Sequence, residues 1–199
     1  YPLGLTAFWA GFAAGVNYAA SFLLVQLLQL TVATKQPAVT APAMVATRAT
    51  TRHSPGETRR QPLPKGFVAN PLPASPTGAS GTMYTNETTK TVVIVAENTI
   101  PGGVNAKDND GPFLDATAAD FATEQAKALP DFTKLSEKSF TQKGTGLGVR
   151  QIDSTATQGG GKTLDTTLMA ASGTRMALVQ VISRLSDNAG HEALIKQIV

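Results

Sequence analysis

The hydrophobic and polar positions divide the chain into two parts of different character. Residues 1–34 contain no Asp, Glu, Lys or Arg, whereas charged residues recur from Lys35 onward. An apolar helix of about 20 residues is long enough to cross a bilayer. The pattern therefore predicts an N-terminal transmembrane-type helix within residues 1–34, with 3–34 in the membrane. A secretory signal peptide is the alternative, but it begins with basic residues that this segment lacks.

Beyond residue 60, hydrophobic periodicity and turn residues predict short strands and two helices. The β-branched run TVVIVA at 91–96 predicts a buried central strand. Alternating positions and Gly-rich turns predict further strands at 138–143, 149–157, 163–171 and 175–184. The last two are separated by a tight SGT turn, which predicts a β-hairpin.

The two predicted helices have recognisable ends. Residues 115–129 precede Pro130, and Thr117 and Asp120 have the spacing of a capping box. Residues 187–199 begin at Asp187, a suitable N-cap, and place Leu194, Ile195 and Ile198 on one buried face. Together the elements predict an α+β domain at 61–199, an antiparallel sheet with helices packed on one face.

Residues 35–60 connect the two parts and are basic and rich in Pro and Thr, which is typical of a linker. Residues 1–66 hold six basic residues and one acidic residue, whereas the remainder holds eleven and thirteen. A slightly acidic domain lacks the basic face that nucleic acid requires, so no nucleic-acid partner is expected. The linker is suited instead to anionic lipid. The absence of cysteine excludes disulfide and thiolate chemistry.

Several short motifs suggest chemistry but fail in detail. GGGKT at 159–163 resembles a phosphate loop, but it lacks the earlier glycine and is followed by a predicted strand, so a hairpin turn is expected around Lys162. GTGLG at 144–148 lacks the spacing of a dinucleotide fingerprint and also predicts a turn. KDNDG at 107–111 lacks both essential ends of a calcium loop. His191 stands alone in the sequence and is expected to be a surface or packing residue.

No catalytic, cofactor-binding or metal-binding residue is therefore assigned, and no cofactor is expected. The Asn86-Glu87-Thr88 sequon is not taken as a functional site. A phosphate or nucleotide enzyme that uses Lys162 is kept as a remote alternative.

The stretch FWAGFAAGVNYAASFLLVQLLQLTVATKQPAVTAPAM resembles part of a multi-pass bacterial membrane protein family called site-specific recombinase. The similarity covers residues 3–44, and ATKQPAVTAPA is its most specific part. Recombinase chemistry needs a nucleophilic Tyr framed by Arg and His, or an activated Ser among arginines. Tyr84 is isolated and His53 has no evident partner, so this chemistry is not expected here.

The order of elements in residues 61–199 resembles the PsbP/Mog1-like fold and, within it, the bacterial envelope proteins related to DcrB. The resemblance is carried by PLPKGF at 62–67, MYTNETTKTVVIV at 83–95, VRQIDSTA at 149–156 and the hairpin at 163–184. It implies a non-enzymatic binding or assembly domain. Known envelope relatives are secreted or lipid-anchored, and this chain lacks the lipobox cysteine.

The sequence thus predicts a membrane-associated bacterial envelope protein at the inner membrane. A non-catalytic domain would bind a protein partner in the periplasm. The positive-inside rule would instead place the basic linker in the cytoplasm, which leaves the orientation open. The alternative function is a fragment of a multi-pass protein of the recombinase-named family, and the junction between the two parts is also consistent with a fusion.

Overall fold

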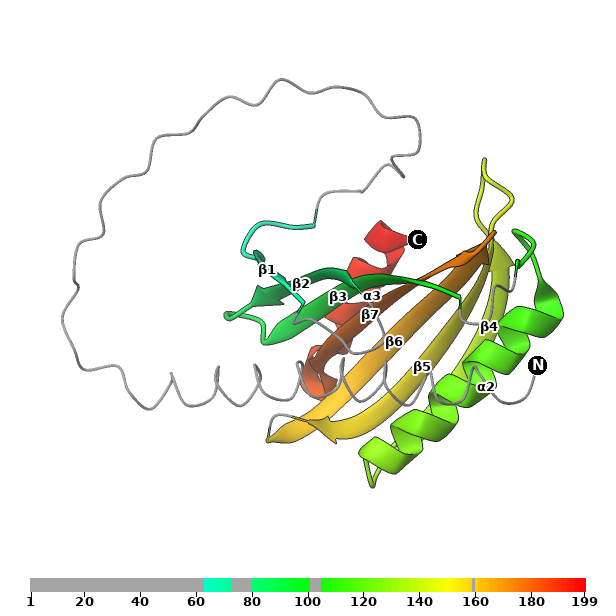
Figure 1. The fold of residues 1–199 in the computed structure, drawn as a ribbon. Helices are drawn as coiled ribbons and strands as arrows, with labels where there is room; N and C mark the ends of the chain where they lie inside the picture. The colour runs from blue at the N-terminus through cyan, green and yellow to red at the C-terminus, as the bar shows by residue number, and fades with distance from the viewer. Residues whose placement is uncertain (1–62, 73–79, 101–104, 159) are drawn as a thin grey trace, which may run out of the picture.

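The computed structural model describes residues 63–72, 80–100, 105–158 and 160–199. Within these residues, seven antiparallel strands form one sheet in the order β1-β2-β3-β7-β6-β5-β4 (Figure 1). The strands are β1 (Val68–Pro71), β2 (Ser80–Asn86), β3 (Thr91–Thr99), β4 (Thr133–Thr141), β5 (Gly148–Gln158), β6 (Gly161–Ser172) and β7 (Arg175–Arg184). The α+β class and the antiparallel sheet are therefore confirmed.

Most predicted strands lie close to their predicted positions. The β6–β7 hairpin is confirmed, and Gly173 in its turn has a φ of 60°, a conformation that favours glycine. β4 begins at Thr133, five residues before the expected start at 138. The prediction missed these residues because they are exposed and show little apolar periodicity. β3 was predicted to be the central strand; it is an interior strand, but the central position of the sheet belongs to β7.

Two helices, α2 (Gly111–Ala128) and α3 (Asn188–Ile198), pack on opposite faces of this sheet (Figure 1). The expectation that both helices share one face is wrong. TVVIVA is apolar at every position, and successive side chains of a strand point to opposite faces. Both faces of β3 therefore require cover, and one helix supplies it on each side.

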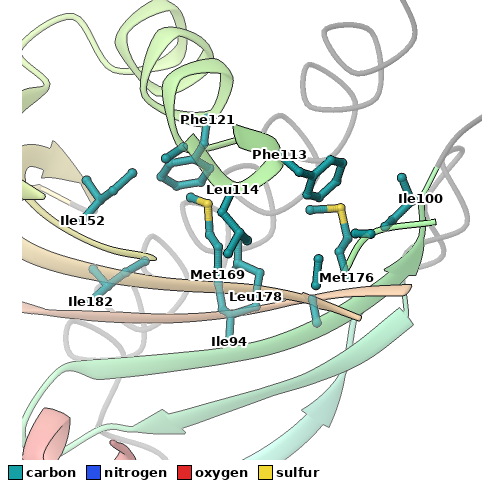
Figure 2. Packing of buried hydrophobic residues seen from close by; sticks show 14 of the residues in the cluster. Ile94, Ile100, Phe113, Leu114, Phe121, Ile152, Met169, Met176, Leu178 and Ile182 are labelled. Carbon is teal, nitrogen blue, oxygen red and sulfur yellow. The ribbon is translucent and has the colours of Figure 1, made fainter. Parts of the chain in front are cut away.

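The larger core lies between the sheet and α2. Figure 2 shows Phe113, Leu114 and Phe121 of α2 above Ile94 of β3 and Met169 of β6. These side chains are nearly free of solvent contact. Burying one such side chain contributes about 1.5–3 kcal/mol, which makes this layer the main source of the domain's stability.

The smaller core lies on the other face and includes α3. Val93 of β3, Val181 of β7 and Leu194 of α3 are its fully buried members. Half-buried Ile195 and Ile198 pack against it, as do Phe67 and Val95. Leu194 is buried as expected, whereas Val95, Ile195 and Ile198 keep partial exposure because α3 is short and covers only part of this face.

The two helix starts differ in how well the sequence predicted them. Asp187 caps α3 as predicted, and its carboxylate accepts a hydrogen bond from the Gly190 amide at 3.3 Å. The predicted start of α2 is wrong, because Asp110 is the N-cap and accepts from the Phe113 amide at 3.2 Å. Thr117, expected to cap, is fully buried about two turns further along. Pro112 at the start of the helix favours the observed position, since its fixed φ suits a first turn.

None of the helices in the described residues is long and apolar enough to span a membrane. The predicted transmembrane-type segment at 3–34 and the linker at 35–60 lie outside the described residues.

Substitution of Val93 by Asp should unfold much of the domain. Val93 is 1% exposed, so the carboxylate would be buried without a partner and cost several kcal/mol of the roughly 5–15 kcal/mol typical of a domain. Thr89→Asp in the exposed β2–β3 turn is the control and should be tolerated. Thermal melts that show equal stability for the two variants would contradict this account of β3.

Candidate functional site

An open groove lies on the α3 face, between α3 and the edge strand β4. Its volume is about 540 Å³. Strands β5 and β6 form its floor, and β4 and α3 form its two walls. The lining residues are Leu135, Ser136, Lys138, Gln151, Asp153, Leu164, Thr166, Asn188, His191, Glu192, Ile195 and Lys196. We call this feature the α3–β4 groove.

The walls of the α3–β4 groove combine apolar and charged side chains. Leu135 is 57% exposed and lies at an irregularity in the β4–β5 pairing, where the register shifts between Lys134 and Ser136. A bulge of this kind redirects a side chain and often occurs beside binding sites. Lys138 on β4 and Lys196 on α3 supply positive charge on opposite walls, and Glu192 supplies negative charge.

A hydrogen-bonded chain of buried groups underlies the groove, and His191 is at its centre. His191 is 3% exposed, and its two ring nitrogens lie 2.8 Å from Ser183 Oγ and 2.7 Å from Thr166 Oγ1. Thr166 in turn donates to Asp153 Oδ1 at 2.7 Å. The chain therefore connects α3 with β7, β6 and β5.

The hydrogen-bond directions follow from the number of available protons. The Thr166 hydroxyl has one proton, which it donates to Asp153 because a carboxylate only accepts. It must then accept from His191 Nε2–H. In the neutral ring, which the lowered pKa of His191 favours, Nδ1 accepts from the Ser183 hydroxyl. Burial lowers the pKa of His191 below its usual 6.5, against the raising effect of Asp153, Asp187 and Glu192.

Asp153 is the charged end of this chain. Its carboxylate also accepts from Ser136 Oγ at 2.8 Å and from Gln151 Nε2 at 3.2 Å. Burial raises the pKa of Asp153, but the hydrogen bonds from Thr166, Ser136 and Gln151 outweigh it and leave the pKa below its ordinary value. Asp153 therefore remains ionised at neutral pH and fixes the orientation of the surrounding hydroxyl and amide groups.

The arrangement is better suited to binding than to nucleophilic attack. The hydroxyls beside His191 belong to Ser183 and Thr166, which are 1% and 2% exposed. A nucleophile must reach its substrate, and the base must be free to take its proton. Here the Thr166 proton is already committed to the Asp153 carboxylate. The network instead anchors α3 to the sheet and holds the floor of the groove rigid.

The sequence did not identify this site. His191 was expected to be a surface or packing residue, and it is a buried residue that also lines the groove. Ser136, Asp153, Thr166 and Ser183 were not singled out. The one available signal is the alternation in β5, which places Gln151 and Asp153 on the same face of the sheet.

The predicted β5–β6 hairpin is confirmed, with Gly160 in its turn and Lys162 paired with Thr157 at the start of β6. Gly160 has a φ of 77°, which explains the need for glycine there. Lys162 forms a short ion pair with Asp131, and Asp131 also accepts from the Thr157 amide at 2.9 Å. The Lys162 and Thr157 hydrogen bonds hold the pKa of Asp131 well below its usual range. Lys162 therefore ties the start of β6 to the connection between α2 and β4.

The other motifs also have structural roles. GTGLG forms the β4–β5 turn, where Gly144 and Gly146 have positive φ. In KDNDG, Asp110 caps α2 and Asp108 accepts a hydrogen bond from Ser172. Asn86 holds the β2–β3 turn by accepting from the amides of Thr88 and Thr89. Within the described parts of the chain, no three His, Cys, Asp or Glu side chains lie close enough to hold a metal ion.

Comparison with known protein families gives a match for the first part of the chain. Residues 1–62 match the family model described as site-specific recombinase, a longer stretch than the predicted 3–44. The match ends immediately before the described domain begins at residue 63. His53 lies within this stretch and outside the described residues. No curated protein matches the chain significantly.

Comparison with solved structures shows the fold of the second part. The cyanobacterial PsbP protein of Synechocystis sp. PCC 6803 aligns with a TM-score of 0.52 at 9% identity, over 68% of this chain and 80% of that one. LpqN of Mycobacterium tuberculosis, involved in cell envelope biogenesis, aligns with a TM-score of 0.45 at 13% identity, over 69% and 78%. PA94 of Pseudomonas aeruginosa gives 0.41 at 16% identity, over 72% and 82%. The PsbP alignment shows that the domain has the PsbP-like fold that the sequence resemblance implied.

Replacement of His191 by Gln should remove a pH dependence from the domain's stability. The unfolded chain binds a proton at the ordinary His pKa of 6.5, whereas the folded pKa is lower. His191 therefore supports folding above pH 6.5, and this support is lost as the pH falls from there through the folded pKa. Urea unfolding at about pH 8 and pH 5 should show the difference between wild type and variant shrinking at acid pH. A constant difference would mean that His191 keeps an ordinary pKa.

Replacement of Lys162 by Ala should change the melting temperature by less than about 2 °C, because exposed ion pairs contribute little. Calorimetry with nucleoside triphosphates should detect no binding to either protein. Lysine-dependent binding in the micromolar range would contradict the turn assignment and favour the enzyme alternative.

Proposed function

We propose that this chain is a membrane-associated bacterial envelope protein whose PsbP-like domain is a non-catalytic binding module. A segment of a partner protein docks in the α3–β4 groove. The observation that carries the proposal is the groove itself, because it joins an exposed apolar wall to a floor of oriented polar groups.

The apolar part of the groove supports a protein partner. Leu135 is 57% exposed on one wall, and Ile195 is half-buried on the other. A side chain that enters between them would exclude water from both, which gives favourable burial energy. Leu164 is almost fully covered and closes the floor beneath them.

The polar part of the groove supports specificity. Gln151 and Ser136 are held by Asp153, and Asn188 and Glu192 line the α3 side. Polar groups that are already oriented lose little entropy when they bind, so they discriminate between partners at low cost. The outer edge of β4, which pairs only with β5 among the described strands, offers additional backbone groups to an extended segment.

The membrane setting rests on the first part of the chain. Residues 3–34 are uncharged and long enough to span a bilayer. Residues 1–62 match the family model described as site-specific recombinase, and the sequence of residues 3–44 resembles a multi-pass membrane protein family of that name. In this proposal they hold the domain at the inner membrane, and the domain lies in the periplasm. The basic linker at 35–60 would lie near anionic lipid headgroups.

One observation favours a second candidate function. The family match ends at residue 62, next to residue 61, where the sequence predicts that the α+β domain begins. Residues 1–62 are then a fragment of a multi-pass protein of the recombinase-named family, joined to an unrelated domain. Genomic sequence upstream of Tyr1 that encodes further apolar spans in the same reading frame would support this alternative.

Site-specific photocrosslinking in intact cells tests the binding role. A photoreactive amino acid at Leu135 and, separately, at Lys196 should capture the same partner from the two walls. The same group at Ala119, which is exposed on α2 on the opposite face, is the matched control and should not capture it. Adding Leu135→Asp to the Lys196 probe should reduce the adduct several-fold without unfolding the domain, because Leu135 is exposed.

The absence of an adduct from both walls, or equal capture from Ala119, would contradict docking in the groove. Protease treatment of spheroplasts reports the orientation in the same cells. A periplasmic domain should be degraded in spheroplasts and protected in intact cells, whereas a cytoplasmic domain would be protected in both.

A further inference from the structure

A second cluster of buried polar side chains lies on the opposite face of the sheet, the face that carries α2. Its members are Gln158 of β5, Thr163 and Asp165 of β6, and Gln180 of β7. Each is between 1% and 3% exposed. The cluster shares no residue with the α3–β4 groove or with the His191 chain.

The hydrogen bonds of this cluster leave an excess of acceptors. Gln158 Nε2 donates to Asp165 Oδ2 at 2.6 Å and lies 3.2 Å from Thr163 Oγ1. Thr163 donates its own proton to the Ala156 carbonyl at 3.2 Å. Three buried oxygens then have no partner: Asp165 Oδ1, Gln158 Oε1 and Gln180 Oε1. All three are acceptors if Asp165 is ionised, and none can satisfy another.

The strand register places these groups close together. Asp165 is opposite Ile182 of β7, and Gln180 is two residues from Ile182 on the same face. Diagonal neighbours of this kind have Cβ atoms roughly 7–8 Å apart, within reach of a glutamine side chain. Gln158 is already bonded to the other oxygen of the same carboxyl group. A single hydrogen on Asp165 Oδ1 would convert one acceptor into a donor for either glutamine carbonyl.

We propose that Asp165 is a buried proton-binding site. In the folded domain it is a neutral carboxylic acid that donates its Oδ1 hydrogen to a glutamine side-chain carbonyl. The alternative is a buried carboxylate beside unpartnered carbonyl oxygens, which is the costlier arrangement because a buried charge needs opposite charge or several donors.

The electrostatic surroundings agree with a neutral acid. Burial raises the pKa of Asp165 to about 7, although the hydrogen bond from Gln158 lowers it in part. The charged side chains of this face have other partners: Glu124 pairs with Lys127, Arg150 pairs with Asp115, and Arg184 donates to the Gln158 backbone carbonyl. Among the described residues, Asp165 has no ion pair that would keep it charged.

This site makes folding depend on pH in a defined direction. The folded pKa is raised from 3.8 to about 7, so the stabilising contribution is complete below 3.8 and is lost as the pH rises through 7. The dependence is opposite in sign to that of His191, and the two act on opposite faces of β6. The melting temperature of the wild type alone contains both pH-dependent contributions, so the contribution of Asp165 is measured by comparison with an Asp165 variant.

Asp165→Asn in the full chain is the decisive variant, because asparagine is neutral at every pH and its amide replaces the proposed donor. Between about pH 5 and pH 8.5 the wild-type melting temperature should fall relative to the variant by on the order of 5–10 °C. The variant should be the more stable protein at the higher pH. Asp120→Asn on α2, where the carboxyl group is partly exposed, is the matched control and should follow the wild type.

Infrared spectroscopy gives an independent measurement that does not depend on stability. The carbonyl stretch of a protonated carboxylic acid should be present in the wild type at about pH 5.5, absent from Asp165→Asn, and lost from the wild type as the pH rises through about 7. If that band is missing, or if Asp165→Asn is the less stable protein at about pH 8.5, then Asp165 is an ionised group stabilised by a bound water or cation, and the proposal is overturned.

Discussion

The burial of β3 and β7 on both faces is the constraint on which the rest of this structure depends. Val92 and Ile94 face α2, whereas Val93 and Val181 face α3. A strand with apolar side chains on both sides cannot leave either face in water without losing several kcal/mol of burial energy. The domain is therefore three layers, helix, sheet and helix, and the position of each helix decides which parts of the sheet remain open.

The two helices are held in place by different polar contacts. Arg150 Nε of β5 donates to Asp115 of α2 at 2.7 Å, which ties the start of α2 to the sheet. His191 ties α3 to β6 and β7 through neutral hydrogen bonds. Because α3 has only eleven residues, it leaves β4 and part of β5 uncovered on its face. The α3–β4 groove is the direct consequence of this short helix.

The middle strands carry both polar clusters. Asp165 and Thr166 are adjacent in β6 and, by the alternation of a strand, belong to opposite faces. Thr166 takes part in the His191 chain, and Asp165 belongs to the acceptor cluster with Gln158. Buried polar groups of this kind contribute little stability but disfavour other packings of the sheet. Through these two clusters, one on each face of the sheet, the stability of the domain would depend on pH.

The amino-acid sequence by itself determined the local elements and the class of fold. The alternation in β6 and β7, the N-cap Asp187 and the glycine turns at 144–148 and at Gly160 depend on neighbours in the chain, so they were predicted correctly. The start of α2 was predicted incorrectly, because Asp110, its N-cap, also fitted a loop of acidic residues. Only the tertiary structure decided which helix covers which face. It also brought together Ser136, Asp153, Thr166 and His191 from four separate elements. Strand alternation separates two faces but does not identify what packs on each, and that choice is made by contacts between residues far apart in the chain.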